Sequence, residues 1–258
     1  MQLKQLLPIL SWLPGYDKTN LRGDLSAGLT VGVMLIPQGM AYAMIAGMPP
    51  IYGLYAATIP IILYSMLGTS RQLAVGPVAM ISLLTAAGVG TIAEAGSENY
   101  IALVIMLALM VGVLQLMLGV FRLGFMVNFL SHPVISGFTS AAAIVIGLSQ
   151  LKHLLGIKMP KGEHLHEILY GAWQHIGETN FLTLGIGLGA IVLIQLVKKW
   201  KKSFPGSLLA VVAGILLVWG LGLHEQGVKI VGKVPGGLPA VGLPHFDWAT
   251  IQSLLPIA

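Results

Sequence analysis

Hydrophobic residues in this chain come in long unbroken runs rather than in the short alternating patterns of a soluble fold. A helix needs roughly 17 to 25 apolar residues to cross a lipid bilayer. Seven runs reach that length, at about residues 24–46, 51–68, 74–93, 100–121, 124–149, 181–197 and 206–223. Charged residues fall near or beyond the ends of these runs. The pattern therefore predicts an all-α membrane protein with seven transmembrane segments.

Proline interrupts two of the predicted spans. Pro37 and Gln38 lie inside the first, and Gly76 and Pro77 lie near the start of the third. Lipid tolerates a broken helix only where the exposed backbone is buried in protein or faces an aqueous cavity. Two broken helices, the first and the third, therefore predict the two halves of a solute site and favour a transporter.

The first break carries polar groups that suit an oxyanion. Gln38 follows the proline directly, and Tyr42 lies four residues later on the same helical face. An amide and a phenol can hydrogen-bond an anion without contributing charge. The alternative is a proline kink buried in lipid, with Gln38 bonded to a neighbouring helix.

The second break predicts a helix start that binds an anion through its backbone. If Pro77 occupies the first turn, the N–H groups of Val78, Ala79 and Met80 point out of the helix. Such groups, together with the helix dipole, attract an anion without a buried cation. Gly76 and Ala79 are small enough for a ligand to approach the backbone. The alternative is an ordinary span that begins at the membrane surface.

Composition narrows the class further. The chain is 56% hydrophobic and 9% charged, against roughly 25% charged in soluble domains. It contains no cysteine, which excludes disulfides and thiolate metal sites. No cleaved signal peptide is recognised, so we expect the first span to direct insertion. The net charge of +5 does not point to nucleic acid, because the basic residues flank the spans.

The distribution of charge predicts a cytoplasmic N-terminus. With that orientation the cytoplasmic side carries nine of the fourteen basic residues and two of the nine acidic ones. Lys and Arg prefer the cytoplasmic side of a membrane. An odd number of spans followed by a copy of itself produces an inverted repeat. Neither proline break recurs within the chain, so we expect one repeat whose partner lies elsewhere.

Further motifs favour structural roles. Gly28-x-x-x-Gly32 and Gly185-x-x-x-Gly189 predict close helix packing. Residues 228–234 alternate as an edge strand would, and residues 247–258 suit a short interfacial helix.

Polar clusters do not point to catalysis or a metal. The lysines of residues 198–202 predict a cytoplasmic anchor, with acidic-lipid binding as the alternative. His164 and His166 do not predict a zinc site, because residues two apart do not share a helical face. No nucleophile–base pair, phosphate loop or nucleic-acid surface is recognised. We therefore predict no enzyme, no metal and no cofactor.

Several longer motifs resemble one family of transporters. They are Leu13-Pro-Gly-Tyr16, Ile36-Pro-Gln-Gly-Met-Ala-Tyr-Ala43, Pro50-Ile-Tyr-Gly-Leu-Tyr55, Gly68-Thr-Ser-Arg71, Val75-Gly-Pro-Val-Ala79, Ser131-His-Pro-Val-Ile-Ser-Gly-Phe-Thr-Ser-Ala-Ala142, Gln150-Leu-Lys-His-Leu-Leu-Gly156 and Gly236-Gly-Leu-Pro239. Through them the chain resembles the SulP family, the sulfate-permease or solute-carrier-26 anion transporters. The matches are spread over nearly the whole chain.

The resemblance implies a fold and a site. It implies a seven-plus-seven inverted repeat with core and gate domains, usually followed by a cytoplasmic STAS domain. The family's anion sits between the facing N-termini of the third and tenth helices, beside the first helix. Carried over, the substrate-binding residues are Gln38, Tyr42, Gly76, Pro77, Val78 and Ala79. The second repeat and the STAS domain lie outside these 258 residues, so we expect an incomplete half-transporter.

These observations lead to one functional hypothesis and several alternatives. We expect a multi-pass protein of the inner (plasma) membrane that carries a small anion by alternating access, with sulfate first and bicarbonate or a dicarboxylate next. A co-transported proton or sodium ion and a homodimer are left open. The alternatives are an anion channel on the same fold, a non-transporting membrane scaffold or sensor, and a nucleobase carrier.

Overall fold

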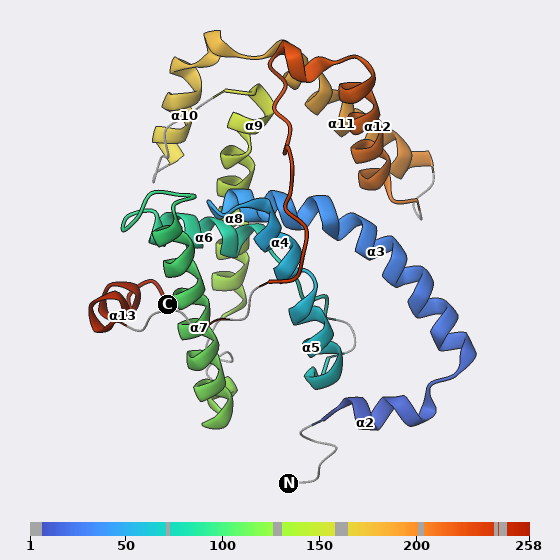
Figure 1. The fold of residues 1–258 in the computed structure, drawn as a ribbon, viewed down its shortest axis with the longest axis vertical. Helices are drawn as coiled ribbons and strands as arrows, with labels where there is room; N and C mark the ends of the chain where they lie inside the picture. Colours follow the sequence, from blue (N-terminus) through green and yellow to red (C-terminus); the bar gives the residue numbers. More distant parts are fainter. Residues whose placement is uncertain are drawn as a thin grey trace.

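Helices follow one another along the chain in the computed structural model, which describes residues 7–70, 73–125, 131–157, 165–200, 204–239, 242 and 247–258 (Figure 1). The α-helices are α2 (Ile9–Trp12), α3 (Lys18–Ile45), α4 (Pro50–Ala56), α5 (Ile59–Leu67), α6 (Ala79–Val89), α7 (Glu98–Val120), α8 (His132–Ser149), α9 (Leu151–Leu155), α10 (Leu165–Gln174), α11 (Phe181–Trp200), α12 (Gly206–Gly220) and α13 (Trp248–Leu254). Short 3₁₀ turns are η1 (Leu13–Gly15), η3 (Ile176–Glu178) and η4 (Leu223–Gln226).

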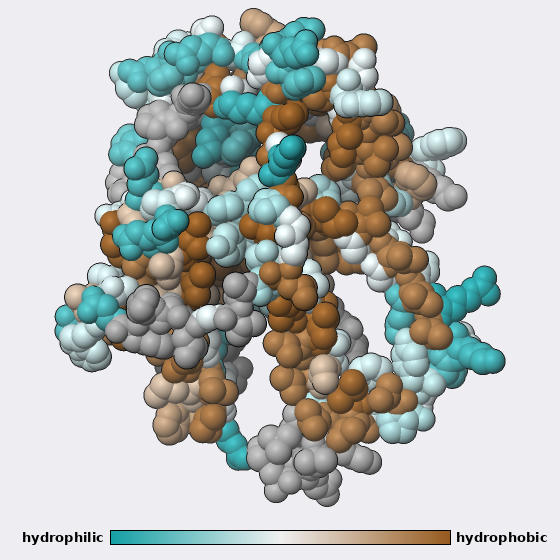
Figure 2. All heavy atoms as spheres, in the orientation of Figure 1, coloured by the Kyte–Doolittle hydropathy of each residue, from teal (hydrophilic) through white to brown (hydrophobic). Residues whose placement is uncertain are grey.

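Five helical stretches of the described residues are long and apolar enough to cross a membrane. They are Lys18–Ile45, Pro50–Leu67, Glu98–Val120, His132–Leu155 and Phe181–Trp200. The helices α6 and α12 are also apolar but shorter. Each of the seven predicted spans therefore contains a helix, while the crossing of the membrane by α6 and α12 stays a prediction. Hydrophobic side chains cover the outer faces of α3, α5 and α12, as expected for surfaces that face lipid (Figure 2).

The predicted break in the first span is wrong. The helix α3 runs without interruption from Lys18 to Ile45, and Pro37 lies inside it. Proline removes one N–H from the hydrogen-bond ladder, and membrane helices tolerate this where neighbouring protein supports the backbone. Here α4 gives that support, because Gly53 of α4 packs directly on Gly39, two residues after the proline.

The predicted break in the third span is also not seen in the form expected. The structure has no helix at residues 73–78, and α6 begins at Ala79. Gly76 and Pro77 therefore precede a helix that starts late, instead of interrupting a longer one. The physical reason lies at Val78, whose β-branched side chain favours the extended backbone it adopts, with φ −130° and ψ 142°.

Helices α3 and α4 pack closely at two glycines that lie outside the predicted small-residue motifs. A Cβ on Gly39 would lie 3.0 Å from the carbonyl oxygen of Gly53, and a Cβ on Gly53 would overlap the carbonyl of Gly39. In contrast, no described atom lies within 4 Å of a Cβ built on Gly28, Gly32 or Gly185. The same holds for Gly189. The packing prediction for both motifs is therefore wrong within the described residues.

The buried core lies where the end of α3 meets α6, α7 and α13. Its buried members are Ala43, Ala46, Met48, Val89, Tyr100, Leu103, Met106, Leu107 and Leu254. Tyr100 is fully buried, and its hydroxyl donates a hydrogen bond to the carbonyl oxygen of Ala46 at 2.6 Å. This bond joins residues 54 positions apart and holds the end of α3 against α7.

Replacing Tyr100 by phenylalanine should lower the free energy of unfolding by about 1–2 kcal/mol, because a buried carbonyl loses its donor. Reversible unfolding of the purified chain in mixed micelles measures the effect. Tyr170→Phe is the matched control, since Tyr170 is 63% exposed on α10. Equal stability of the two variants would show that the bond from Tyr100 contributes nothing.

The C-terminal part of the described chain crosses the molecule. After η4 it runs without regular structure, and residues 234–239 lie against α4 and the start of α5 (Figure 1). The predicted strand at residues 228–234 is wrong, because these residues form no regular structure and Gly232 among them has a positive φ of 74°. The predicted helix within residues 247–258 is confirmed as α13. Leu254 of α13 is fully buried in the core, so at least one face of this helix packs on protein.

Candidate anion site

A cavity of about 1300 Å³ lies beside α3 and contains most of the predicted site residues. Its walls come from α2, η1, α3, α5 and the segment that leads into α6. Four of the six predicted residues line it: Gln38, Gly76, Pro77 and Val78. The space-filling view shows the molecule hollowed between α3 and α5 (Figure 2). The structure thus brings the two proline segments, some forty residues apart in sequence, to one cavity.

On α3, the side chains of Gln38 and Tyr42 are joined. The Nε2 group of Gln38 donates a hydrogen bond to the hydroxyl oxygen of Tyr42 at 3.1 Å. The bond leaves the second amide N–H of Gln38 and the phenolic O–H of Tyr42 as donors. Gln38 is exposed and lines the cavity, while Tyr42 is partly buried behind it. The pair holds the Gln38 amide in position at the cavity wall.

At the start of α6, three backbone N–H groups have no acceptor within the helix. Val78 is the N-cap residue, and the first intrahelical bond runs from Ser82 N–H to the Val78 carbonyl at 3.1 Å. The N–H groups of Ala79, Met80 and Ile81 therefore belong to the open end of the helix. The prediction placed this set one residue too early, because the helix begins at Ala79 instead of in the turn of Pro77.

The entry to α6 approaches α3 closely. A Cβ on Gly76 would lie 3.8 Å from Cδ2 of Leu35, which is one turn before Gln38. Upstream, the Ser70 hydroxyl accepts a hydrogen bond from Leu73 N–H at 3.2 Å, and Tyr64 Oη donates to the Ser70 carbonyl at 3.4 Å. These bonds order the chain between α5 and α6 at the cavity wall.

Among the described residues that line the cavity, one is charged, and it lies at the far end. Asp24, near the start of α3, accepts a hydrogen bond from Tyr16 Oη at 2.6 Å. That hydrogen bond, with smaller contributions from desolvation and the nearby carboxylates, raises the pKa of Tyr16. Asp24 lies fourteen residues before Gln38 on one helix, or about 21 Å. At that distance its charge is largely screened from the Gln38 end.

The lining residues that sequence reasoning missed are hydroxyl-bearing side chains. They are Ser11, Tyr16, Thr58, Tyr64, Ser65, Thr69 and Ser70. Thr69 and Ser70 belong to a motif that carried the family resemblance, and this was the signal available for them. Tyr16 belongs to another of those motifs. The rest lie on or next to α5 or in the N-terminal segment, and only the chain's path brings them to the cavity.

Residues 21–258 match the sulfate permease family. The chain belongs to this family. It is 41% identical over 259 residues to sulfate transporter 4.1, chloroplastic, of Arabidopsis thaliana, covering 97% of the chain and 38% of that relative. The chain thus spans well under half of the relative that it matches.

Two solved structures share the arrangement of helices. The structure of SLC26A9 matches with a TM-score of 0.85 and 26% identity, over 98% of this chain and 44% of the other. The transmembrane domain of the cyanobacterial bicarbonate transporter BicA matches with a TM-score of 0.80 and 26% identity. This match covers 94% of this chain and 62% of the BicA chain. The sulfate permease chain therefore has the SLC26-type transmembrane fold, and it is a multi-pass membrane protein.

Proposed function

We propose that this chain is the N-terminal half of a secondary transporter that carries a small anion by alternating access. The leading substrate is sulfate, and bicarbonate or a dicarboxylate is next. The observation that carries the proposal is that Gln38, which is bonded to Tyr42, and Val78, the N-cap residue of α6, line one cavity.

The chemistry of the cavity supports an anion over a cation. At its Gln38 end the Gln38 amide lines the cavity, and the Tyr42 phenol and the open N–H groups of α6 belong to residues next to lining residues. A helix N-terminus carries a partial positive charge, and such an end binds anions without a formal cation. Among the described lining residues the one carboxylate, Asp24, lies at the opposite end of the cavity.

The relatives narrow the substrate class. One is named as a sulfate transporter and another as a bicarbonate transporter. Sulfate and bicarbonate are oxyanions, which accept several hydrogen bonds from donors of the kind present here. We propose that Gln38, Tyr42, Gly76, Pro77, Val78 and Ala79 form one half of the site. The other half would come from a second, inverted repeat that follows Ala258.

The setting of the protein completes the proposal. Nine of the fourteen basic residues lie on the same side of the membrane as the N-terminus, which supports a cytoplasmic N-terminus in the inner (plasma) membrane. Partners would be the bilayer, a C-terminal repeat and a STAS domain, with a homodimer as one assembly. Any coupling to a proton or a sodium ion would depend on residues of the second repeat.

Radiolabelled sulfate uptake into proteoliposomes tests the proposal. This chain is compared with a longer protein that carries a second repeat after Ala258, and bicarbonate and a dicarboxylate are tested as competitors. We expect uptake by the longer protein alone. Uptake by the 258-residue chain would show that one repeat holds a complete site. A longer protein that binds sulfate but does not move it would be a sensor instead.

A further inference from the structure

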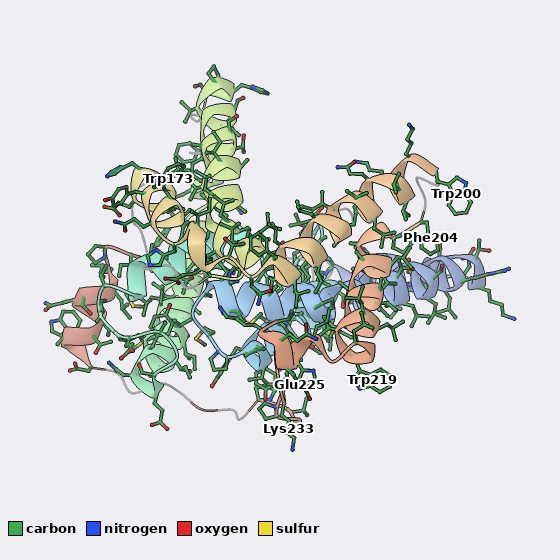
Figure 3. The ribbon with its side chains drawn as sticks, turned by 90° about the horizontal axis from the view of Figure 1, so that it is seen from above. Trp173, Trp200, Phe204, Trp219, Glu225 and Lys233 are labelled. Carbon is green, nitrogen blue, oxygen red and sulfur yellow. The ribbon has the colours of Figure 1, made fainter. Side chains whose placement is uncertain are left out.

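The hairpin of α11 and α12 ends in a patch of aromatic and basic side chains that the transport site does not use. The two helices pack against each other. A Cβ built on Gly206, at the start of α12, would lie 3.4 Å from the side chain of Val197. Trp200 is 92% exposed at the end of α11, and Phe204 is 48% exposed beside it (Figure 3). Lys198 and Lys199 occupy the last turn of α11.

The position of this patch relative to a bilayer follows from the helix length. The 20 residues of α11 span about 30 Å, the thickness of the hydrocarbon core. Exposed aromatic side chains mark both ends of the hairpin, with Trp200 and Phe204 at one end and Trp219 at the other (Figure 3). Phe181, which is also exposed, is the first residue of α11. Amphipathic aromatic rings prefer the level of the lipid headgroups. The lysines therefore lie at the headgroup level.

Within the described part of the chain, no acidic side chain is found to neutralise the positive charges of Lys198 and Lys199. No acidic residue occurs between Glu178 and Glu225. No ion pair of Lys198 or Lys199 is found within the described part of the chain. The helix C-terminus carries about half a negative charge, which is less than the two positive charges beside it. An external anion at this level of the membrane would balance the excess.

We propose that Lys198, Lys199 and Trp200 form a binding site for the phosphate headgroup of an acidic phospholipid. Successive residues do not share a helical face, so the long, flexible side chains of Lys198 and Lys199 bring their ammonium groups to the phosphate oxygens, while Trp200 anchors the helix end at the headgroup level. The apolar faces of α11 and α12 receive the acyl chains, since Leu196 and Val212 on these helices are exposed. A lipid fits this surface better than an acidic protein segment does, because its headgroup can bind the lysines while its acyl chains cover the apolar faces of α11 and α12.

Native mass spectrometry of the full chain in neutral detergent tests the proposal, with phosphatidylglycerol and phosphatidylcholine as the probes. The key variant is Lys198→Gln with Lys199→Gln. The control is Lys229→Gln with Lys233→Gln, which removes the same charge from exposed lysines in the segment that follows η4 (Figure 3). We expect the key variant to raise the Kd for phosphatidylglycerol about tenfold and the control to leave it within twofold.

The remaining outcomes also decide the question. Trp200→Ala should weaken phosphatidylglycerol binding by a smaller factor, and binding of phosphatidylcholine should not change in any variant. Equal losses in the key variant and the control would overturn the site, because they would reflect net charge alone. Displacement of the lipid by equimolar glycerol 3-phosphate would assign the patch to a free phosphate. Preferred binding of a glutamate-rich peptide would assign it to a protein partner. Far-UV circular dichroism confirms that each variant is folded.

Discussion

Replacing Gly53 by alanine is expected to destabilise the protein more than the same replacement at Gly39 or Gly112. The added Cβ would overlap the backbone carbonyl of Gly39, and it would also lie 3.0 Å from the Cβ of Ala43. Backbone atoms cannot rotate away, so α3 and α4 would have to separate by about 1 Å to restore van der Waals distances. We expect a loss of about 3 kcal/mol in the free energy of unfolding.

A series of glycine variants gives this prediction its controls. Gly39→Ala should cost less, because its Cβ would lie 3.0 Å from the Gly53 carbonyl oxygen. Gly112→Ala on α7 meets no described atom within 4 Å and should be neutral or stabilise by up to about 1 kcal/mol. Unfolding in mixed micelles and the yield of monodisperse protein measure all three. If Gly53→Ala and Gly112→Ala were equally stable, the close approach of α3 and α4 would be wrong.

Alanine at Gln38 is expected to weaken anion binding by about ten- to a hundredfold. A hydrogen bond to a charged group contributes about 1.5–3 kcal/mol, and each 1.4 kcal/mol changes the Kd tenfold. The measurement is the Kd for sulfate in a longer protein that carries a second repeat, since half of the proposed site lies there. The bond between Gln38 and Tyr42 predicts that Tyr42→Phe weakens binding by a smaller factor.

The chain offers a matched control for Gln38. Gln115 lies in the second half of α7, is exposed and does not line the cavity. Gln115→Ala should leave the Kd for sulfate unchanged. An unchanged Kd in Gln38→Ala would remove Gln38 from the site. If both glutamines had equal effects, the cause would be a general disturbance of the membrane helices.

The proposed site could be located from the sequence because its elements are local. A proline beside a polar or small residue within an apolar run is visible without a structure, and both such segments line the same cavity. The details at each segment were wrong. Pro37 sits inside an intact helix because α4 packs against the following turns. The helix after Pro77 starts at Ala79 because Val78 is extended.

Long-range packing could not be inferred in the same way. Two glycine motifs suggested close contacts, yet the contact found joins Gly39 to Gly53. Any glycine can permit a close approach, and which one does depends on where the helices cross. The hydroxyl groups of Thr58 and Ser65 likewise belong to the cavity only because α5 runs beside α3.

The sequence by itself determined that this protein crosses a membrane, that its family is that of the sulfate permeases, and which two proline segments the proposed site is built on. These follow from the length of apolar runs and from local motifs, which the bilayer and the backbone constrain directly. Only the tertiary structure decided that α3 is continuous, that α6 starts at Ala79, and that Gln38 and Gly76 share a cavity. The reason is that helix continuity and side-chain meeting points depend on contacts between residues far apart in the chain, which no local pattern contains.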